Sequence, residues 1–280
     1  MILENQRKKI IIFRFIIILI ILGLIIGFFV AKKNNKQIPS SSGTTTMGNG
    51  NSEANEETIF AIDSILFYSS ANAISNSETQ KDYWNLNVYQ YTDMSIKINN
   101  HVYSDKLTAS NLVTQLYIDN VKFSTKPILG TPGIFYKNPT SLGKPIVDDL
   151  DNKISERLDF TVNSENSTVD YTKPSFYTDC SNPITLSYVN SSVDSSLLIK
   201  NSSSTVTFDG SLLQKSGTKL NNIAATVDFT IHIINANDDE FVCNVSLPIP
   251  LNDEQKSIYD GHYIKELTNI DNLNFVKVSK

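Results

Sequence analysis

A stretch of alternating polar and aromatic residues offers the most suggestive binding chemistry in the sequence. Asn85, Asn87, Tyr89, Tyr91 and Asp93 share one parity, opposite to apolar residues such as Trp84, Leu86, Val88 and Met94, so one face of a β-strand would carry all five. Flat aromatic rings beside amides and a carboxylate can stack on sugars and hydrogen-bond their hydroxyl groups. These residues form a candidate ligand-binding face, for which an envelope glycan is a suitable ligand. The alternative is that a second sheet, a loop or a helix covers this face, because tyrosine is common at half-buried strand positions.

The two cysteines, Cys180 and Cys243, allow two interpretations. In an oxidising compartment they could form a disulfide that closes a loop of 63 residues. By restricting the unfolded chain, such a disulfide would stabilise the folded state by about 4 kcal/mol. Alternatively, both are buried free thiols that pack as small hydrophobic groups. The sequence does not favour either interpretation over the other.

Metal and catalytic signatures are absent from the sequence. The three histidines, His101, His232 and His262, are far apart and show no metal-ligand spacing. The acidic stretches 148–152 and 235–240 lack the ligand and glycine pattern of a calcium-binding loop. No nucleophile elbow, phosphate-binding loop or dinucleotide motif occurs. We therefore expect no metal, no cofactor and no enzymatic activity.

The elements that position these residues are predicted to be strands, because apolar residues recur at every second position over long stretches. Residues 58–280 are expected to form an all-β, antiparallel β-sandwich of the immunoglobulin-like or jelly-roll-like kind. A polar segment at 138–153 is a candidate boundary between two modules. Short helices are expected at 149–157 and from Asn252 to Gly261. The predicted strands are 59–68, 84–98, 116–123, 134–136, 157–162, 184–188, 197–200, 205–208, 223–233 and 241–249.

The N-terminal region reads as a membrane anchor. A short tail, 1–9, precedes the apolar segment 10–31, which has no charge from Phe15 to Ala31. A helix of this length spans about 33 Å, close to the thickness of a bilayer core. Phe29 is too bulky for the cleavage site of a secretory signal, which favours an uncleaved signal anchor. Gly23 and Gly27 have the spacing of a transmembrane dimer face, so a homodimer is a further hypothesis.

Composition and charge narrow the function further. Residues 32–57 are rich in Ser, Thr, Gly and Asn and predict a flexible linker. The chain carries −5 overall and +6 within residues 1–36, which leaves −11 for the remaining 244 residues. An acidic body repels phosphate backbones, so nucleic-acid binding is not expected.

The small excess of positive charge before the apolar segment predicts that the body lies outside the membrane. The abundance of Ile, Asn and Lys suggests an A+T-rich genome, such as that of a Gram-positive bacterium.

These features predict a single-pass protein of the cell membrane whose C-terminal body is extracytoplasmic. We expect a non-enzymatic binding or assembly module of the cell envelope, with the bilayer as one partner and an envelope glycan or a membrane protein as another. One alternative is an anchored enzyme that acts on envelope polysaccharide with a pair of carboxylates. Another is a subunit of a membrane protein complex, which an exposed apolar patch would favour.

Overall fold

The computed structural model describes residues 59–76, 82–100, 107–146, 152–164, 166–200, 206–268, 270 and 273–279. These residues belong to one compact unit, Glu56–Lys280. The predicted tail 1–9, the apolar segment 10–31 with Gly23 and Gly27, and the linker 32–57 lie outside the described residues. Within the described ranges, no helix has the length and hydrophobicity needed to cross a bilayer.

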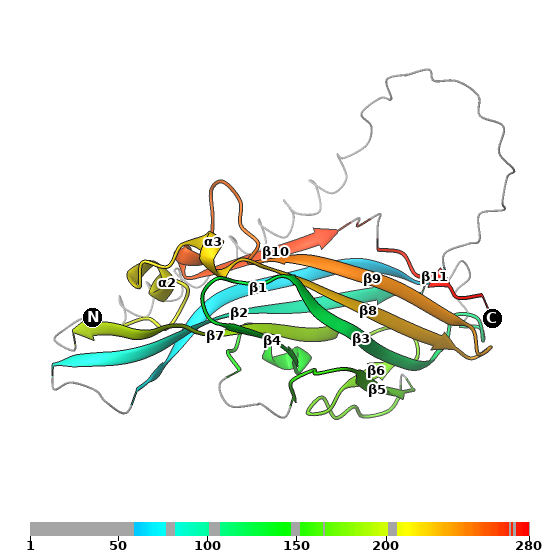
Figure 1. Cartoon of the computed structure of the whole chain (residues 1–280). Helices are drawn as coiled ribbons and strands as arrows, with labels where there is room; N and C mark the ends of the chain where they lie inside the picture. The colour runs from blue at the N-terminus through cyan, green and yellow to red at the C-terminus, as the bar shows by residue number, and fades with distance from the viewer. Residues whose placement is uncertain are drawn as a thin grey trace, which may run out of the picture. The chain divides into compact units, whose positions relative to one another are not determined.

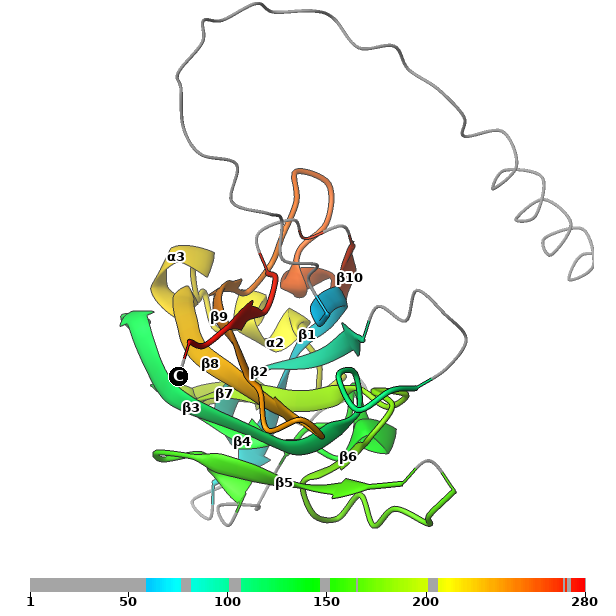
Figure 2. The ribbon, with the colours of Figure 1, turned by 90° about the vertical axis from the view of Figure 1, so that its right-hand side faces the viewer.

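The body is a sandwich of two β-sheets (Figures 1 and 2), as the alternating pattern predicts. Sheet A has five strands in the order β10-β1-β2-β7-β4, and sheet B has six in the order β11-β9-β8-β3-β5-β6. Every pair of neighbouring strands is antiparallel except β5 and β6, which are parallel. Sheet A comprises β1 (Ala61–Ser75), β2 (Tyr83–Asn99), β4 (Thr131–Tyr136), β7 (Ile184–Lys200) and β10 (His262–Thr268). Sheet B comprises β3 (Val113–Thr125), β5 (Leu158–Asn163), β6 (Ser175–Tyr177), β8 (Ala225–Asn235), β9 (Glu240–Ile249) and β11 (Val276–Lys277).

Most of the predicted strands are found, with different lengths. The hairpin of β8 and β9 around the polar turn is confirmed. The segments 184–188 and 197–200 belong to the single strand β7, and residues 206–208 are not a strand. The helix predicted from Asn252 is wrong apart from one short turn, η3 (Ile258–Asp260), which is capped by Ser257. In the described part of the other predicted helix, Asn152 has a 3-10 conformation and residues 153–157 are not helical.

The segment 138–153 does not separate two sheets. Strand β7, which follows it in the chain, lies between β2 and β4, which precede it. In the same way β3 pairs with both β5 and β8. Within this segment the structure describes a short turn, η1 (Pro139–Ser141).

Two hydrophobic cores lie on the inner face of sheet A. The larger fills the space between the sheets, and Phe67, Met94, Leu186 and Ile231 are among its buried residues. The smaller lies where β1, β2 and β7 extend beyond sheet B (Figure 1). Short helices cover it there, namely α2 (Ser211–Lys215), α3 (Leu220–Ile223) and η3. We call this three-stranded extension, residues 71–75, 83–90 and 191–200, the ribbon.

A row of buried polar side chains separates the two cores. Thr92 of β2 hydrogen-bonds Ser69 of β1 across 2.9 Å. Gln90 lies opposite Asn190 of β7, and both are completely buried. The layer that packs on the inner face of sheet A changes near this row from sheet B to the short helices. On one side, Phe123 of β3 packs against Tyr188, and on the other, Leu129 and the helices pack against the second core.

Candidate functional site

The structure divides the five residues of the predicted binding face. Asn85 and Asn87 lie half-buried on the outer face of the ribbon, whereas Tyr89, Tyr91 and Asp93 are at most 5% exposed. The two tyrosine rings are therefore buried, whereas glycan binding on this face stays a prediction. The alternative of a covered face is found at these residues, because β2 is covered on its outer face as well as on its inner face.

A loop that follows β4, residues 137–144, covers part of the outer face of sheet A, at Tyr68, Tyr91 and Asp93. The backbone N–H of Gly143 donates to Asp93 Oδ2 over 2.7 Å, and the Tyr91 hydroxyl donates to the Gly143 carbonyl over 2.9 Å. Gly143 has a φ of +79°. A Cβ at this position would lie 3.2 Å from the ring of Tyr68. Both the backbone conformation and the close approach therefore favour glycine.

Beneath this loop, Asp93 and Lys137 form a buried ion pair. Lys137 Nζ lies 3.0 Å from Asp93 Oδ2, and the two side chains are 3% and 0% exposed. The Ser187 hydroxyl donates to Asp93 Oδ1 over 2.7 Å, and Lys137 Nζ also donates to the Lys144 carbonyl. Burial raises the pKa of Asp93 and lowers the pKa of Lys137, while their attraction opposes both shifts. The sequence carries no signal for this pair, because Lys137 lies in no recognisable motif.

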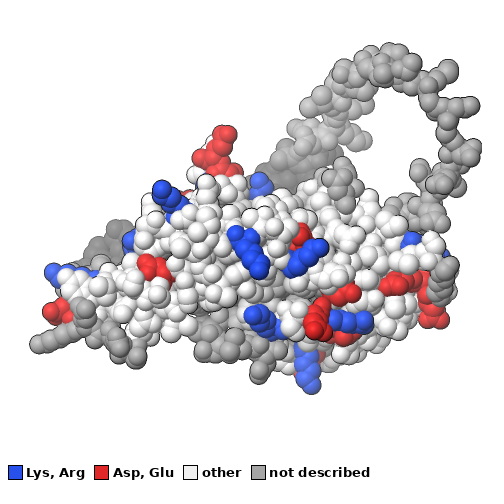
Figure 3. Space-filling view, viewed as in Figure 1, with Lys and Arg blue, Asp and Glu red and all other residues white. Residues whose placement is uncertain are grey.

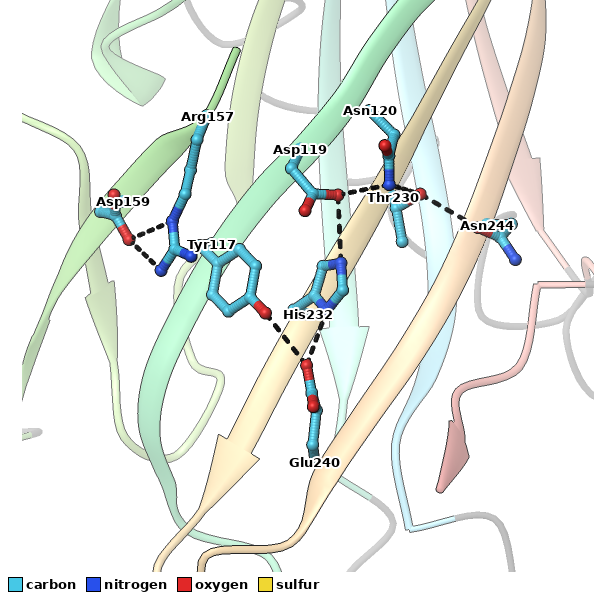
Figure 4. Close-up of polar contacts among 9 residues, drawn as sticks. All are labelled: Tyr117, Asp119, Asn120, Arg157, Asp159, Thr230, His232, Glu240 and Asn244. Carbon is cyan, nitrogen blue, oxygen red and sulfur yellow. Dashed lines mark hydrogen bonds and ion pairs between the residues drawn. The ribbon is translucent and has the colours of Figure 1, made fainter. Parts of the chain in front are cut away.

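The outer face of sheet B carries a second polar cluster, centred on His232 (Figure 4). His232 Nε2 lies 3.1 Å from Asp119 Oδ1 of β3, and Nδ1 lies 2.9 Å from Glu240 Oε1 of β9. Hydrogen bonds from His232 and then from the Tyr117 hydroxyl lower the pKa of Glu240. The imidazole thus fills the space between the two carboxylates. They do not face one another across an open groove, as a glycosidase pair would.

The aromatic rings of this cluster are stacked on one another. Figure 4 shows Tyr117 between Arg157 and His232. The Arg157 guanidinium lies 3.6 Å from the Tyr117 ring centroid, and the His232 ring stacks on Tyr117 with centroids 4.3 Å apart. Arg157 is held in turn by Asp159 over 2.6 Å. Tyr117 of β3 therefore contacts β8 through His232, β9 through Glu240 and the residue before β5 through Arg157, and both faces of its ring are occupied.

A bulge in β3 opens a shallow depression beside the cluster. The pairing of β3 with β8 shifts register between Asp119 and Lys122, and Asn120 within the bulge has a φ of +53°. The bulge directs the Asn120 amide across β8, where Nδ2 lies 3.4 Å from Thr230 Oγ1. The depression has a volume of about 330 Å³ and is lined by Asn120, Lys122, Asp228, Phe229, Thr230, Asn244, Val245 and Ser246. Acidic and basic side chains are intermixed on this face (Figure 3), so it has no strong electrostatic preference for one sign of ligand.

The tip of the ribbon exposes apolar side chains. Ile74, Tyr83, Leu198 and Phe208 are each between 38% and 49% exposed. The register places Leu198 opposite Asn85, and Tyr83 two pairs further along, on the same outer face. On the inner side, Phe208 stacks on Trp84 with ring centroids 6.4 Å apart. Four of the nine exposed large hydrophobic residues in the described part of the chain therefore gather at this tip.

The remaining candidate residues form no reactive centre. Cys180 and Cys243 are both free and buried, so the structure has the second of the two alternatives and no disulfide. Burial raises the pKa of each thiol to about 12. His262 stacks on Tyr68, and His101 lies outside the described residues. No group of three or more His, Cys, Asp or Glu side chains among the described residues is arranged to hold a metal ion.

No family model, no curated protein and no solved structure matches the chain.

Proposed function

We propose that the chain is a non-enzymatic assembly module of the cell envelope that recruits a protein partner with the tip of its ribbon. The observation that carries this proposal is the cluster of exposed apolar residues, Ile74, Tyr83, Leu198 and Phe208, at that tip. Ile74, Tyr83 and Leu198 lie on the outer face of the tip and Phe208 on the inner side, and exposed apolar side chains gathered in one region are typical of sites that bind other proteins. Tyrosine and phenylalanine are also enriched at the centres of such interfaces.

The position of the tip supports this role. In the proposal, residues 10–31 anchor the chain in the membrane, and the linker 32–57 leads to the start of β1. Strand β1 has 15 residues and ends in the ribbon. At about 3.3 Å per residue it extends up to about 50 Å from its first residue. The apolar tip is therefore at the end of the body that lies furthest along β1 from the linker.

Two other functions receive less support from the geometry. A glycan-binding face on β2 would need Tyr89 and Tyr91 at the surface, and both are buried. An enzyme acting on polysaccharide would need two carboxylates with space for a substrate between them. Asp119 and Glu240 have the His232 ring in that space.

Crosslinking in living cells tests the proposal. A photoreactive residue is placed at Leu198 in the full-length protein, and a second variant carries it at Val276, an apolar position on β11 that is 68% exposed against 49% for Leu198. We expect a protein adduct from position 198 and none, or much less, from position 276. A second substitution, Leu198→Asn, combined with a photoreactive residue at Ile74, should strongly reduce the adduct.

Three outcomes would overturn the proposal. The first is equal labelling from positions 198 and 276, which would indicate random collisions. The second is an adduct formed only with another copy of the chain, which would replace the separate partner with a homodimer. The third is labelling of lipid or glycan without any protein.

A further inference from the structure

The ion pair between Asp93 and Lys137 differs sharply from the other Lys–Asp pairs of the described residues. Lys97 and Asp63 are 3.1 Å apart, yet their side chains are 62% and 44% exposed. Lys277 and Asp239 are 3.0 Å apart and also in contact with solvent. The same two functional groups thus occur at the same distance in water and out of water. Only the pair of Asp93 and Lys137 is sealed in, by the loop 137–144 and the strands beneath it.

Burial changes the chemistry of this pair. A charged ammonium cannot act as a nucleophile, and a carboxylate is a poor acyl donor. Removal from water disfavours both charged forms, as the raised pKa of Asp93 and the lowered pKa of Lys137 reflect. Transfer of one proton from Lys137 to Asp93 produces a free amine in contact with a carboxylic acid. These are the reactants of amide formation.

We propose that Lys137 and Asp93 condense to form an intramolecular isopeptide bond. The Nζ lone pair attacks Asp93 Cγ and forms the C–N bond. The C–Oδ2 bond then breaks, and Oδ2 leaves as water with its own proton and one proton from Nζ. The reaction requires no oxidant, reductant or other co-reactant. In the structure Nζ lies 3.0 Å from Oδ2, the oxygen that leaves in this step.

The surroundings favour the step and fit its product. The Ser187 hydroxyl donates to Asp93 Oδ1, where negative charge develops during the attack, so it stabilises the tetrahedral intermediate. Nζ already donates to the Lys144 carbonyl, and the new amide N–H can keep this hydrogen bond. The fold holds both groups in place, so the entropy cost of bringing them together has been met before the reaction begins. Exclusion of solvent also opposes hydrolysis of the product.

The bond would join parts of sheet A that are not neighbours. Asp93 is in β2 and Lys137 directly follows β4, while β7 lies between these two strands. The Lys137 side chain therefore crosses β7 near Ser187, which pairs with Asp93. The result is a covalent crosslink over the outer face of three strands, which fixes the loop 137–144 against the sheet.

Mass spectrometry of the full-length protein, purified in detergent and then denatured, tests this proposal directly. Trypsin should release residues 82–97, which contain Asp93, joined to residues 123–153, which contain Lys137. Cleavage after Lys137 is blocked by acylation, and Lys126 and Lys144 each precede proline, so no shorter fragment forms. The joined peptide should be lighter than the sum of its two parts by one water molecule.

Lys97 and Asp63 are the internal control, because they make a similar contact in water and should yield only unlinked peptides. The variant Lys137→Arg keeps the positive charge and should give the full mass of the unlinked chain, while Asp63→Ala should leave the crosslink unchanged. Separate peptides 123–137 and 138–153 from the wild-type protein would overturn the proposal. The wild-type measurement tests the proposal by itself, so the test stands even if one of the variants fails to fold.

Discussion

Gln90 provides a sharp test of the polar row between the two cores. The side chain is completely buried, and neither Nε2 nor Oε1 has a hydrogen-bond partner among the described residues. Methionine has a similar length and shape but no group that requires a hydrogen bond. We therefore expect Gln90→Met to make the folded protein more stable. Thr92→Val is the matched control, because the Thr92 hydroxyl on the same face of β2 is paired with Ser69.

The size of the effect follows from the number of unpaired atoms. A buried polar group without a partner costs about 1–3 kcal/mol. Gln90 has two such atoms, so removing both should increase the free energy of unfolding by about 1–3 kcal/mol after allowance for imperfect packing of the new side chain. For a body of this size, each kcal/mol corresponds to roughly 2–4 °C in Tm. Thr92→Val should instead lower the free energy of unfolding by about 1 kcal/mol, because it leaves Ser69 unpaired.

Unfolding in denaturant, followed by the fluorescence of Trp84, measures both variants. Trp84 is the only tryptophan and packs against the second core, so its emission reports on this part of the fold. A Gln90→Met protein that is less stable than the wild type would refute the reasoning. It would mean that the Gln90 amide has a partner in solution, such as a buried water molecule.

Three further predictions concern other parts of the body. Gly143→Ala should lower the free energy of unfolding by about 1–2 kcal/mol, because φ is positive at this position, and an unchanged denaturation midpoint would contradict this. The hydrogen bond with His232 lowers the pKa of Glu240 in the folded protein. Glu240 should therefore stabilise the fold at pH values above its unfolded pKa of about 4.3. This contribution should be lost as the pH falls through the lower pKa of the folded state. The Tm difference between wild type and Glu240→Gln, measured at neutral pH and in acid, should therefore shrink in acid, and a constant difference would be contrary evidence. Cys180 and Cys243, each with a pKa of about 12, should resist alkylation until the protein is denatured, and rapid labelling of the native protein would count against their burial.

The period-two pattern predicts the strands well because each strand needs only its own residues to show which face is apolar. The inner face of β2 follows this pattern at Met94, Ile96 and Ile98, which are all buried. Its outer face could not be predicted in the same way. Asp93 is buried by a contact with Gly143, which is 50 positions away in the chain. No local pattern in the sequence records which loop will cover a strand.

The His232 cluster has the same limitation. The alternation along its strand correctly places His232 on the outward face, and Tyr117 and Glu240 also lie on that face. Asp119, however, is 113 positions from His232, and the two meet only because β3 pairs with β8. The strand predicted around Phe208 is a different kind of error. Phe208 is not in a strand, and its ring stacks on Trp84. Strand identity was therefore accessible from sequence, whereas pairing between distant segments was not.

The long strand β1 also determines how the body would respond to mechanical force. It is hydrogen-bonded to β2 along its whole length and to β10 along half of it. In antiparallel sheets these bonds are perpendicular to the strand axis. A pull between the first residue of β1 and the ribbon tip would therefore act in shear, and many hydrogen bonds would share the load at once. A body that is attached at the start of β1 and bound to a partner at the ribbon tip would therefore resist tension well. A body whose strands separate by breaking one hydrogen bond after another would resist it far less.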